Sequence, residues 1–322
     1  MPLVIRNLQF IIIHIFAYMK ILVSPLDWGL GHSTRLSALV FQLYADGNEI
    51  VLAGSGLSLQ LLTADHPTLR CMQLKSFSPF FFRHLPQWIA ISVQVPWFVW
   101  CIIREWWQVR KLLSAEAFDM IVSDNRYGVR NNKCKSILLT HQLSPITAMW
   151  APEWFNKIFA WCLAQMINRF DEVWVPDISP YPNGLAGRLA NPEYISTPIR
   201  TIGLLSRLKR PQTVSSEHID HLAIISGPEP QRSLMQERIE KLFASLSGTK
   251  VICDGQHYTS PEYLAQCIAQ AEHIYCRSGY STIMDLVSLN KKATLMPTYG
   301  QAEQEYLCKR MQDFGFCHYS FI

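Results

Sequence analysis

A histidine directly after a glycine-rich turn is the most chemically suggestive feature of this sequence. The stretch reads Ser24-Pro-Leu-Asp-Trp-Gly-Leu-Gly-His-Ser-Thr-Arg35 and follows the apolar run Ile21-Leu-Val23. His32 carries an imidazole, which exchanges protons near neutral pH. Gly29 and Gly31 allow a tight turn and leave room for a ligand close to the backbone. We therefore expect a strand, a ligand-binding loop and a helix in this order.

The predicted helix would point free N–H groups and the positive end of its dipole at the loop, which favours a bound phosphate. Ser33 or Thr34 can cap this helix, and Arg35 lies in its first turn. The loop does not meet the dinucleotide-binding fingerprint, because Thr34 stands where the third glycine is required. The residues alone predict a phosphate-binding loop with a proton-transferring imidazole. An ordinary glycine turn with a chance histidine is the alternative.

Length and composition indicate a two-domain protein that does not bind nucleic acid. The chain has 322 residues, enough for about two domains with separate cores. A net charge of +4 is too mild to indicate nucleic acid but permits attraction to an anionic membrane or a phosphorylated ligand. The nine cysteines form no Cys-x-x-Cys pair, so we expect reduced thiols in a cytoplasmic protein.

The first 18 residues look separate from the fold. Residues 8–18 are apolar apart from Gln9 and His14, and they run directly into Met19-Lys20-Ile-Leu-Val23, the natural first strand. This apolar run is too short to span a bilayer and has no small-residue cleavage site after it. We expect residues 1–18 to be a dispensable extension or the product of a start codon set upstream of Met19. A cleaved secretory signal is the less favoured alternative.

Apolar runs alternate with helix-like segments along the rest of the chain. This rhythm predicts parallel sheets covered by helices on both faces, in an α/β fold with two Rossmann-like domains facing a cleft. We place the first domain at residues 19–203, a linker at 204–220 and the second domain at 221–322, since residues 204–220 carry Ser, Lys, Arg, Pro and Gln and show little apolar pattern.

Polar clusters follow several of the predicted strands. Asp124-Asn-Arg-Tyr-Gly128 and Thr140-His141-Gln142 end two strands of the first domain, and Arg277-Ser-Gly-Tyr-Ser-Thr-Ile-Met-Asp285 lies between a strand and a helix of the second. Ligands of parallel sheets bind beyond the carboxyl ends of the strands. We expect these clusters to line the cleft, with ordinary loop polarity as the alternative.

Residues 77–111 are unusually rich in aromatic and basic residues. Residues 88–103 are almost wholly apolar, and Arg104, Arg110 and Lys111 follow with Trp106 and Trp107 among them. The segment is too short and interrupted for a membrane span. Two interpretations remain open, namely a core helix with a basic exposed end and an interfacial segment that lies on an anionic membrane.

Three stretches of the second half carry a resemblance to a known family. They are Arg277-Ser-Gly-Tyr-Ser-Thr-Ile-Met-Asp-Leu286, the strand to Pro297 and Gln301-Ala-Glu-Gln-Glu-Tyr306. Together they resemble the donor-binding half of MurG-type glycosyltransferases. Gly29-Leu-Gly-His32 resembles the glycine loop of their acceptor half. The resemblance implies the GT-B fold and transfer of N-acetylglucosamine or a similar hexose from a nucleotide-diphosphate sugar, expected to be a UDP-sugar, to a glycan or lipid-linked hydroxyl. It also implies a cytoplasmic protein, with the inner face of the plasma membrane as a place of action.

The same resemblance assigns roles to individual residues. His32 stands for the general base, and Gly29 and Gly31 would face the diphosphate. Asp285 stands where the family has a ribose-binding glutamate, and Glu305 replaces the second residue of a sugar-contacting Gln-Gln pair, which leaves the sugar open. The full donor-binding set comprises Gly29, Gly31, Ser226, Gly227, Arg277, Ser278, Gly279, Ser281, Thr282, Asp285, Gln301, Gln304 and Glu305. The loop Ser226-Gly-Pro-Glu-Pro230 departs from the family's Gly-Gly-Ser pattern.

Two other functions share this architecture. Gly31-His32-Ser-Thr-Arg35 also fits the loop of PseG-type nucleotide-sugar hydrolases, in which water replaces the acceptor hydroxyl, so a hydrolase or an epimerase of the same fold stays open. A non-catalytic nucleotide-sugar-binding protein is the third candidate. No Asp-x-Asp triplet occurs in the chain, so we expect no metal and no cofactor beyond the donor.

Overall fold

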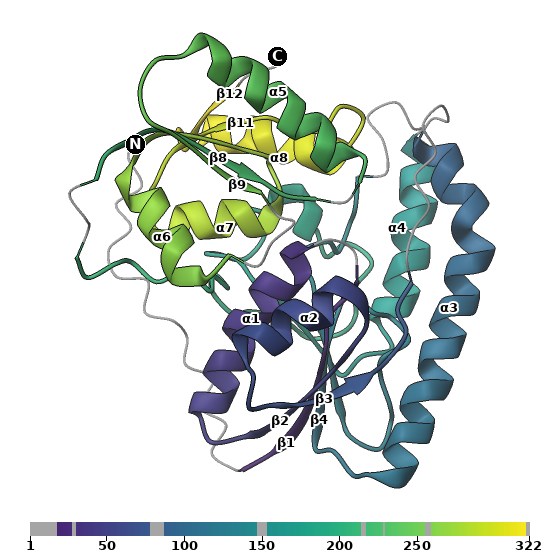
Figure 1. The fold of residues 1–322 in the computed structure, drawn as a ribbon. Coiled ribbons are helices and arrows are strands. Elements are labelled where there is room, and N and C mark those ends of the chain that lie inside the picture. The colour runs from purple at the N-terminus through teal and green to yellow at the C-terminus, as the bar shows by residue number, and fades with distance from the viewer. Residues whose placement is uncertain are drawn as a thin grey trace.

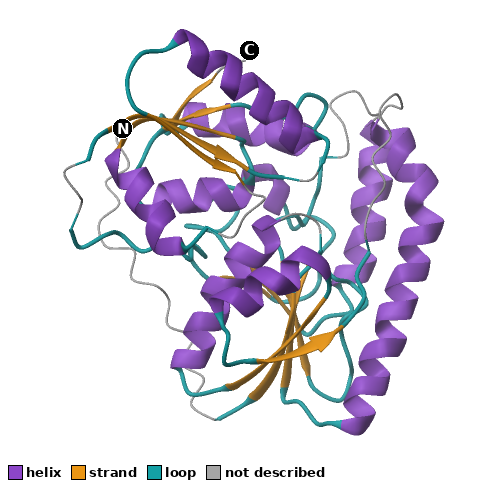
Figure 2. Cartoon of the chain, viewed as in Figure 1, coloured by secondary structure: helices purple, strands orange, loops and turns teal. Residues whose placement is uncertain are grey.

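The computed structural model describes residues 18–27, 30–77, 87–146, 153–213, 217–227, 229–254 and 259–319. Nearly all of the predicted N-terminal extension and Gly29 of the glycine loop lie outside these ranges. The described chain forms two α/β units, one above the other in the views of Figures 1 and 2, each built on a parallel sheet.

The first sheet has seven strands in the order β3-β2-β1-β4-β5-β6-β7, and all neighbours are parallel. Its central strand β1 follows from the apolar run Ile21-Leu-Val23, whose side chains are fully buried. Strands buried on both faces read as continuous apolar runs, which is why they were visible in the sequence. The strands are β1 (Lys20–Ser24), β2 (Glu49–Gly54), β3 (Arg70–Gln73), β4 (Met120–Asp124), β5 (Lys135–Leu139), β6 (Glu172–Val175) and β7 (Ile199–Thr201).

The helices of the first unit are α1 (Leu30–Ala45), α2 (Gly56–Asp65), α3 (Gln87–Ala115), α4 (Glu153–Ile167) and a 3₁₀ turn, η1 (Gly187–Ala190). α3 and α4 run side by side along one flank of the sheet (Figure 1). Cys101, Glu105, Val109 and Leu113 of α3 recur every four residues and are buried. The core-helix interpretation of this segment therefore holds for one side of α3 only, because its opposite side is exposed.

The second sheet has five parallel strands in the order β12-β11-β10-β8-β9. The strands are β8 (Ile219–Ile225), β9 (Lys250–Asp254), β10 (Ala271–Cys276), β11 (Ala293–Leu295) and β12 (Cys317–Tyr319), and the helices are α5 (Gln231–Ser245), α6 (Pro261–Gln270), α7 (Tyr280–Ser288) and α8 (Ala302–Asp313). β12 is an edge strand of three residues that the sequence analysis did not predict.

One of the apolar clusters contains residues of both units. Buried side chains of α7 and α8 pack in the same cluster as Leu185 and Leu189 near η1 of the first unit. In the segment between the units, Arg207 forms an ion pair with Asp65 of α2 and donates to the Thr259 carbonyl before α6. α1 and α7 meet between the sheets. Among the described helices, none combines the length and apolarity needed to cross a membrane.

Candidate active site between the two sheets

His32 lies in the first turn of α1 and contacts a buried carboxylate from a neighbouring strand. Its Nδ1 is 3.1 Å from Oδ1 of Asp124, the last residue of β4. The contact arises because β4 pairs with β1, so the carboxyl ends of both strands reach the same edge of the sheet. The His32 side chain is 16% exposed, whereas Asp124 is completely buried. A buried acid therefore orients a partly accessible imidazole.

Arg35 sits one helical turn after His32 and ties this pair to a second histidine. Its Nε donates to Asp124 Oδ2 at 3.0 Å, and one terminal nitrogen also contacts Asp124 Oδ1. Its other terminal nitrogen donates to His141 Nδ1 at 3.0 Å. A two-point contact of guanidinium and carboxylate fixes both groups in orientation as well as position.

The tautomer of His32 follows from how Asp124 and Arg35 share their hydrogen bonds. His32 Nδ1 is 3.1 Å from Asp124 Oδ1 and 2.9 Å from a terminal nitrogen of Arg35, and it cannot donate to one and accept from the other at once. That Arg35 nitrogen already donates to Asp124. His32 Nδ1–H can then donate to Asp124, which leaves the Nε2 lone pair free to accept a proton.

Charge in this cluster favours an ionised Asp124. Burial by itself raises the pKa of a carboxyl group, but the positive charge of Arg35 and the contact with His32 outweigh it, and the pKa of Asp124 lies below its ordinary value. The ionised form is the one that can hold His32 through an Nδ1–H donor and stabilise an imidazolium. The ionised Asp124 carboxylate beside His32 Nδ1 therefore suits a general base at His32.

His141 extends the cluster across to the second unit. This buried residue follows β5, and its Nε2 is 3.0 Å from Glu303 Oε1 of α8. Its ring stacks on Tyr280 of α7, with centroids 4.0 Å apart. Burial lowers the pKa of His141, which favours a neutral ring that accepts from Arg35 and donates to Glu303. The Glu303 side chain is 33% exposed, so the cluster reaches solvent there.

The N-terminus of α1, which the sequence linked to phosphate, lies against the N-terminus of α7. Ser281, in the first turn of α7, donates through Oγ to the Gly31 carbonyl of α1 at 2.7 Å. A Cβ on Gly31 would lie 3.2 Å from that same Oγ, so this close approach uses the absence of a side chain. Gly279 is the N-cap of α7, and Thr282 follows Ser281 in its first turn. Two positive helix ends thus converge beside His32.

Arg277 organises the predicted donor loop. One terminal nitrogen donates to the Ser226 carbonyl at 3.0 Å, and the other contacts Thr298 Oγ1 and Gln301 Oε1. Gly227 has φ +104°, and a Cβ there would clash with the Arg277 guanidinium. Burial lowers the pKa of Arg277 to about 10, so it remains a cation at neutral pH. Its buried Nε has no hydrogen-bond partner in the described part of the chain.

Gln301, Gln304 and Glu305 lie at the start of α8, where Gln301 contacts Arg277 directly. Gln304 donates to Gln301 Oε1 at 2.6 Å and accepts from the Thr298 N–H, and its own carbonyl accepts from Ser278 Oγ at 2.7 Å. Glu305 accepts from the Gly300 N–H at 3.0 Å. The N-terminal end of α8 therefore reaches Arg277 through Gln301 and the His32 cluster through Glu303.

Asp285 lies farther along α7 and faces the segment between the two units. Its carboxylate accepts a hydrogen bond from Ser206 Oγ, and burial raises its pKa to about 7. Its proposed role in ribose binding stays a prediction. Its contact with Ser206 also gives it a structural role, because it ties α7 to the connecting segment.

We expect Asp285 to make stability fall as pH rises. Its folded-state pKa of about 7 lies above the ordinary 3.8, so between these values the folded protein holds a proton that the unfolded chain has lost. Stability should therefore be highest below about pH 4 for this group and decline up to about pH 7. Asp285→Asn should flatten that slope in urea unfolding measured across this range. An unchanged slope in the variant would contradict the assignment.

The structure brings together most of the residues predicted from the sequence, in two adjoining groups. His32 and Gly31 lie beside Ser281, while Ser226, Gly227, Arg277, Ser278, Gln301 and Gln304 form the second group. Asp124 and His141 belong to the strand-end clusters expected to line the cleft. Sequence reasoning gave no role to Glu303 or Thr298, and it noted Arg35 only for its place in the first turn and in the Gly31-His32-Ser-Thr-Arg35 loop.

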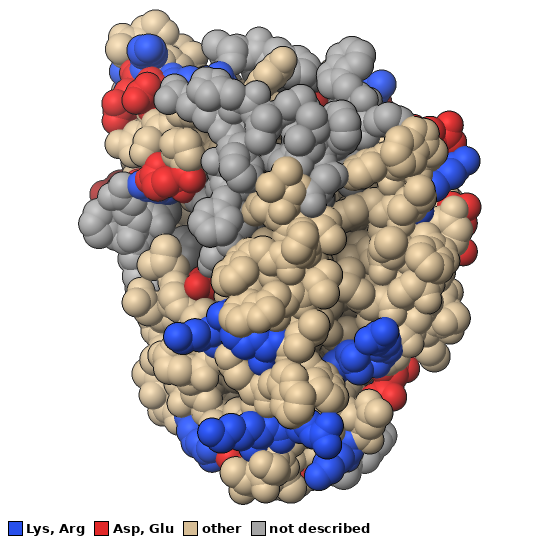
Figure 3. Space-filling view, turned by 90° about the vertical axis from the view of Figure 1, so that its right-hand side faces the viewer, with Lys and Arg blue, Asp and Glu red and all other residues tan. Residues whose placement is uncertain are grey.

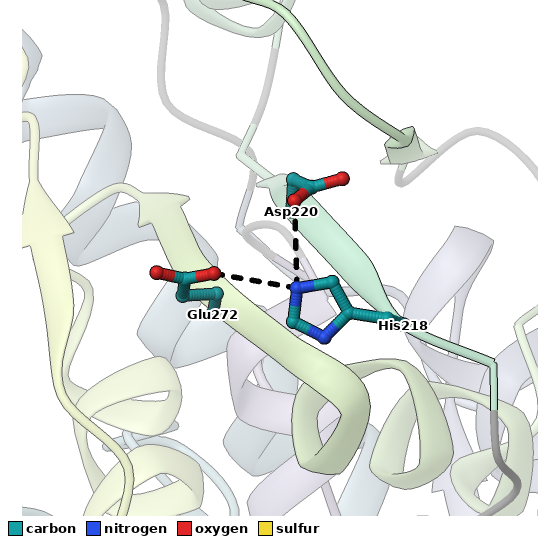
Figure 4. A group of neighbouring side chains, drawn as sticks. All are labelled: His218, Asp220 and Glu272. Carbon is teal, nitrogen blue, oxygen red and sulfur yellow. Dashed lines mark hydrogen bonds and ion pairs between the residues drawn. The ribbon is translucent and has the colours of Figure 1, made fainter.

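One described group of side chains has the composition of a metal site, and it lies away from the cleft. His218 Nε2 is 3.4 Å from Asp220 Oδ1 and 3.3 Å from Glu272 Oε2 (Figure 4). The group stands where β8 and β10 begin, at the opposite end of the sheet from Ser226 and Arg277. His218 and Glu272 are more than half exposed. The contacts are those of an exposed ion-pair network, and this group takes no part in the candidate active site.

Comparison with solved protein structures identifies the fold of this chain. Neither protein-family models nor curated proteins give a match to this sequence. Solved structures do, among them the glycosyltransferase of kitacinnamycin (TM-score 0.62, 13% identity), the spinosyn rhamnosyltransferase SpnG complexed with thymidine diphosphate (0.61, 14%) and MurG of Acinetobacter baumannii (0.54, 14%). Each alignment covers 94% of this chain and 86% of the other chain. The chain therefore has the GT-B fold, as the sequence resemblance predicted.

Proposed function

We propose that this protein is a glycosyltransferase that moves a sugar from a nucleotide-diphosphate donor to a hydroxyl group of an acceptor. The observation that carries the proposal is the His32–Asp124 pair, set directly against the meeting N-termini of α1 and α7. A base and an anion-binding region side by side are what sugar transfer from a nucleotide diphosphate requires. The GT-B fold adds support, because its solved examples named above are glycosyltransferases.

His32 is the general base in this proposal. Its Nε2 takes the proton of the acceptor hydroxyl while the hydroxyl oxygen attacks the sugar C1, and the bond between C1 and the diphosphate oxygen breaks with its electron pair. Asp124 holds His32 through Nδ1 and stabilises the imidazolium that forms. The partly exposed ring of His32 thus takes the proton, and the buried carboxylate of Asp124 positions that ring.

The leaving diphosphate is stabilised without metal in this proposal. The helix N-termini of α1 and α7 supply backbone N–H groups and positive dipole ends. Arg277 supplies a full positive charge, and its orphaned Nε–H suits a phosphate oxygen. Ser281 and Thr282 add hydroxyl donors once the Ser281 contact with Gly31 opens. Gly29 and Gly31 would lie against the diphosphate from the other side.

The donor is proposed to be a UDP-sugar that carries N-acetylglucosamine or a similar hexose. Gln301, Gln304 and Glu305 would contact the sugar, and Asp285 the ribose. Glu303 is the added candidate for sugar binding, because it is partly exposed and adjoins His32 through His141. A sugar hydroxyl could compete with His141 for this carboxylate.

The acceptor is proposed to be lipid-linked, which places the protein at a membrane surface. α3 presents an exposed apolar stripe on the side away from its buried residues, formed by Val93, Trp97, Trp100, Ile103 and Trp107. α4 adds a second exposed stripe of Trp154, Ile158 and Trp161. Tryptophan is favoured at the depth of lipid headgroups, and exposed apolar patches mark sites of interaction with proteins or membranes. We therefore add α4 to the membrane-contacting surface that was predicted for residues 77–111.

A charge placed in the middle of this face is expected to abolish membrane binding. Trp100→Glu puts a carboxylate where Trp97 stacks on Trp100 at 5.1 Å, so vesicle binding measured by flotation should fall to background. Leu57→Glu on α2 is the matched control, since Leu57 is 62% exposed outside this face. Loss of binding in both variants, or in neither, would count against docking through α3 and α4.

The decisive assay measures nucleoside diphosphate release from a panel of nucleotide sugars, with and without a membrane lipid extract. Release that depends on the extract would support transfer to a lipid acceptor and identify the donor. Equal release in water alone would favour the hydrolase. The absence of both release and thermal stabilisation by every nucleotide sugar tested would overturn the enzyme proposal.

A further inference from the structure

A basic hollow adjoins the exposed face of α3 and belongs to neither group of the candidate active site. It has a volume of about 820 Å³ and lies between the C-terminal half of α3, the loop 128–133 and Arg169 after α4. Trp106 and Trp107 form its apolar wall, and Arg110, Arg130, Lys133 and Arg169 supply its cations. None of the residues that line it is acidic.

The cations of the basic hollow have no acidic partners among the described residues. Arg110, Arg130, Lys133 and Arg169 form no ion pair there, whereas Lys135, two residues after Lys133, pairs with Glu172 at 2.6 Å. Arg130 is half-buried, and burial together with the nearby charge of Arg169 lowers its pKa. Like charges gathered around a concave surface repel one another, and a bound anion would relieve that repulsion.

The neighbouring surface indicates where such an anion would come from. Ile103 and Trp107 line the hollow and also belong to the exposed stripe of α3, so the two features are continuous. Figure 3 looks onto the side of the molecule where α3 and α4 lie, and Lys and Arg gather across the lower half of that view, with tan surface between them. Tryptophans at headgroup depth beside cations match the chemistry of an anionic membrane surface.

We propose that the basic hollow binds the phosphate-bearing headgroup of an anionic membrane lipid. Arg130 and Arg169 contact the phosphate, Arg110 and Lys133 flank it, and Trp106 and Trp107 lie against the glycerol and the first acyl carbons. This inference rests on the membrane docking proposed above and deepens it, because it names the lipid chemistry and fixes which end of α3 meets the headgroup. The stripes of α3 and α4 supply binding that does not depend on lipid charge.

The test compares vesicles of phosphatidylcholine alone with vesicles that also contain phosphatidylglycerol. The double variant Arg130→Gln with Arg169→Gln should bind the anionic vesicles about thirtyfold more weakly, since each cation near the surface contributes about a factor of five to affinity. Its binding to neutral vesicles should equal that of the wild type. Arg130→Lys with Arg169→Lys keeps both charges and should retain most of the affinity.

The matched control is Arg238→Gln with Lys241→Gln, which removes two exposed cations from α5 in the second unit. Equal losses in both pairs of variants would show diffuse attraction and overturn the hollow as a site. Unchanged binding in the Arg130 and Arg169 pair would do the same. Inorganic phosphate bound by the wild type and lost in that pair, with vesicle binding intact, would make the occupant a soluble anion. A wild type that binds neither vesicle would overturn the membrane docking itself.

Discussion

His32→Ala is expected to lower the rate of sugar transfer about 10²-fold or more while donor affinity changes little. The physical reason is that the two ring nitrogens of His32 have different surroundings. Its Nδ1 is oriented by Asp124, and its Nε2 has no hydrogen-bond partner among the described residues, so the ring is free to take the acceptor proton. The measurement is kcat with a saturating acceptor, together with the dissociation constant of the donor from calorimetry.

His66→Gln serves as the control for a histidine outside the cluster. His66 follows α2, where its ring contacts Ser37, and burial lowers its pKa. This variant should leave kcat within about twofold of the wild type, because no reacting group touches it. If His32→Ala weakened donor binding as much as it slowed turnover, the residue would be a binding group. The role of general base would then have to be reassigned.

Asp124→Ala is expected to destabilise the fold by about 3–5 kcal/mol, because it leaves Arg35 buried without its carboxylate. Arg35 is 2% exposed and Asp124 is fully buried, so water cannot replace the lost partner. Urea unfolding followed by circular dichroism gives the free energy. Glu153→Ala breaks an exposed pair with Lys157 on α4 and should lower stability far less, because both charges stay in water.

The Asp124→Asn variant separates the role of Asp124 in positioning His32 from its role in stabilising the fold. The amide keeps the size of the side chain and can still accept from Arg35, but it has no negative charge to stabilise a protonated His32. We expect a smaller loss of stability than in Asp124→Ala, and a fall in kcat with the donor dissociation constant unchanged. Wild-type kcat in a folded Asp124→Asn protein would limit Asp124 to a structural role.

The pH dependence of stability gives an independent check on Asp124. Its pKa in the folded protein lies below the ordinary 3.8, so its contribution is present above about pH 4 and is lost as the pH falls through the folded value. This trend is opposite in sign to the one expected for Asp285. The two carboxylates can therefore be distinguished in one series of unfolding experiments.

Much of the fold could be predicted from the sequence because its signals are local. Ile21-Leu-Val23 and Leu222-Ala-Ile-Ile225 are continuous apolar runs, as is typical of buried parallel strands. Ser260 followed by Pro261 is a local pattern typical of a helix start, and in the structure Ser260 Oγ accepts from the Tyr263 N–H at the start of α6. β12 was missed because three residues at a sheet edge carry too short a pattern to be read.

The sequence also indicated the right region for the candidate site, through the glycine loop and the polar residues that end the strands. What only the tertiary structure decided is which of these side chains meet. Asp124 and His141 lie 92 and 106 positions from the α1 residues they contact, His32 and Arg35 respectively, and Glu303 is 162 positions from His141. Strand order and the docking of α7 on α1 set these contacts. Local sequence preferences determine where each loop lies in the chain, but only long-range packing brings the side chains of these loops into one cluster.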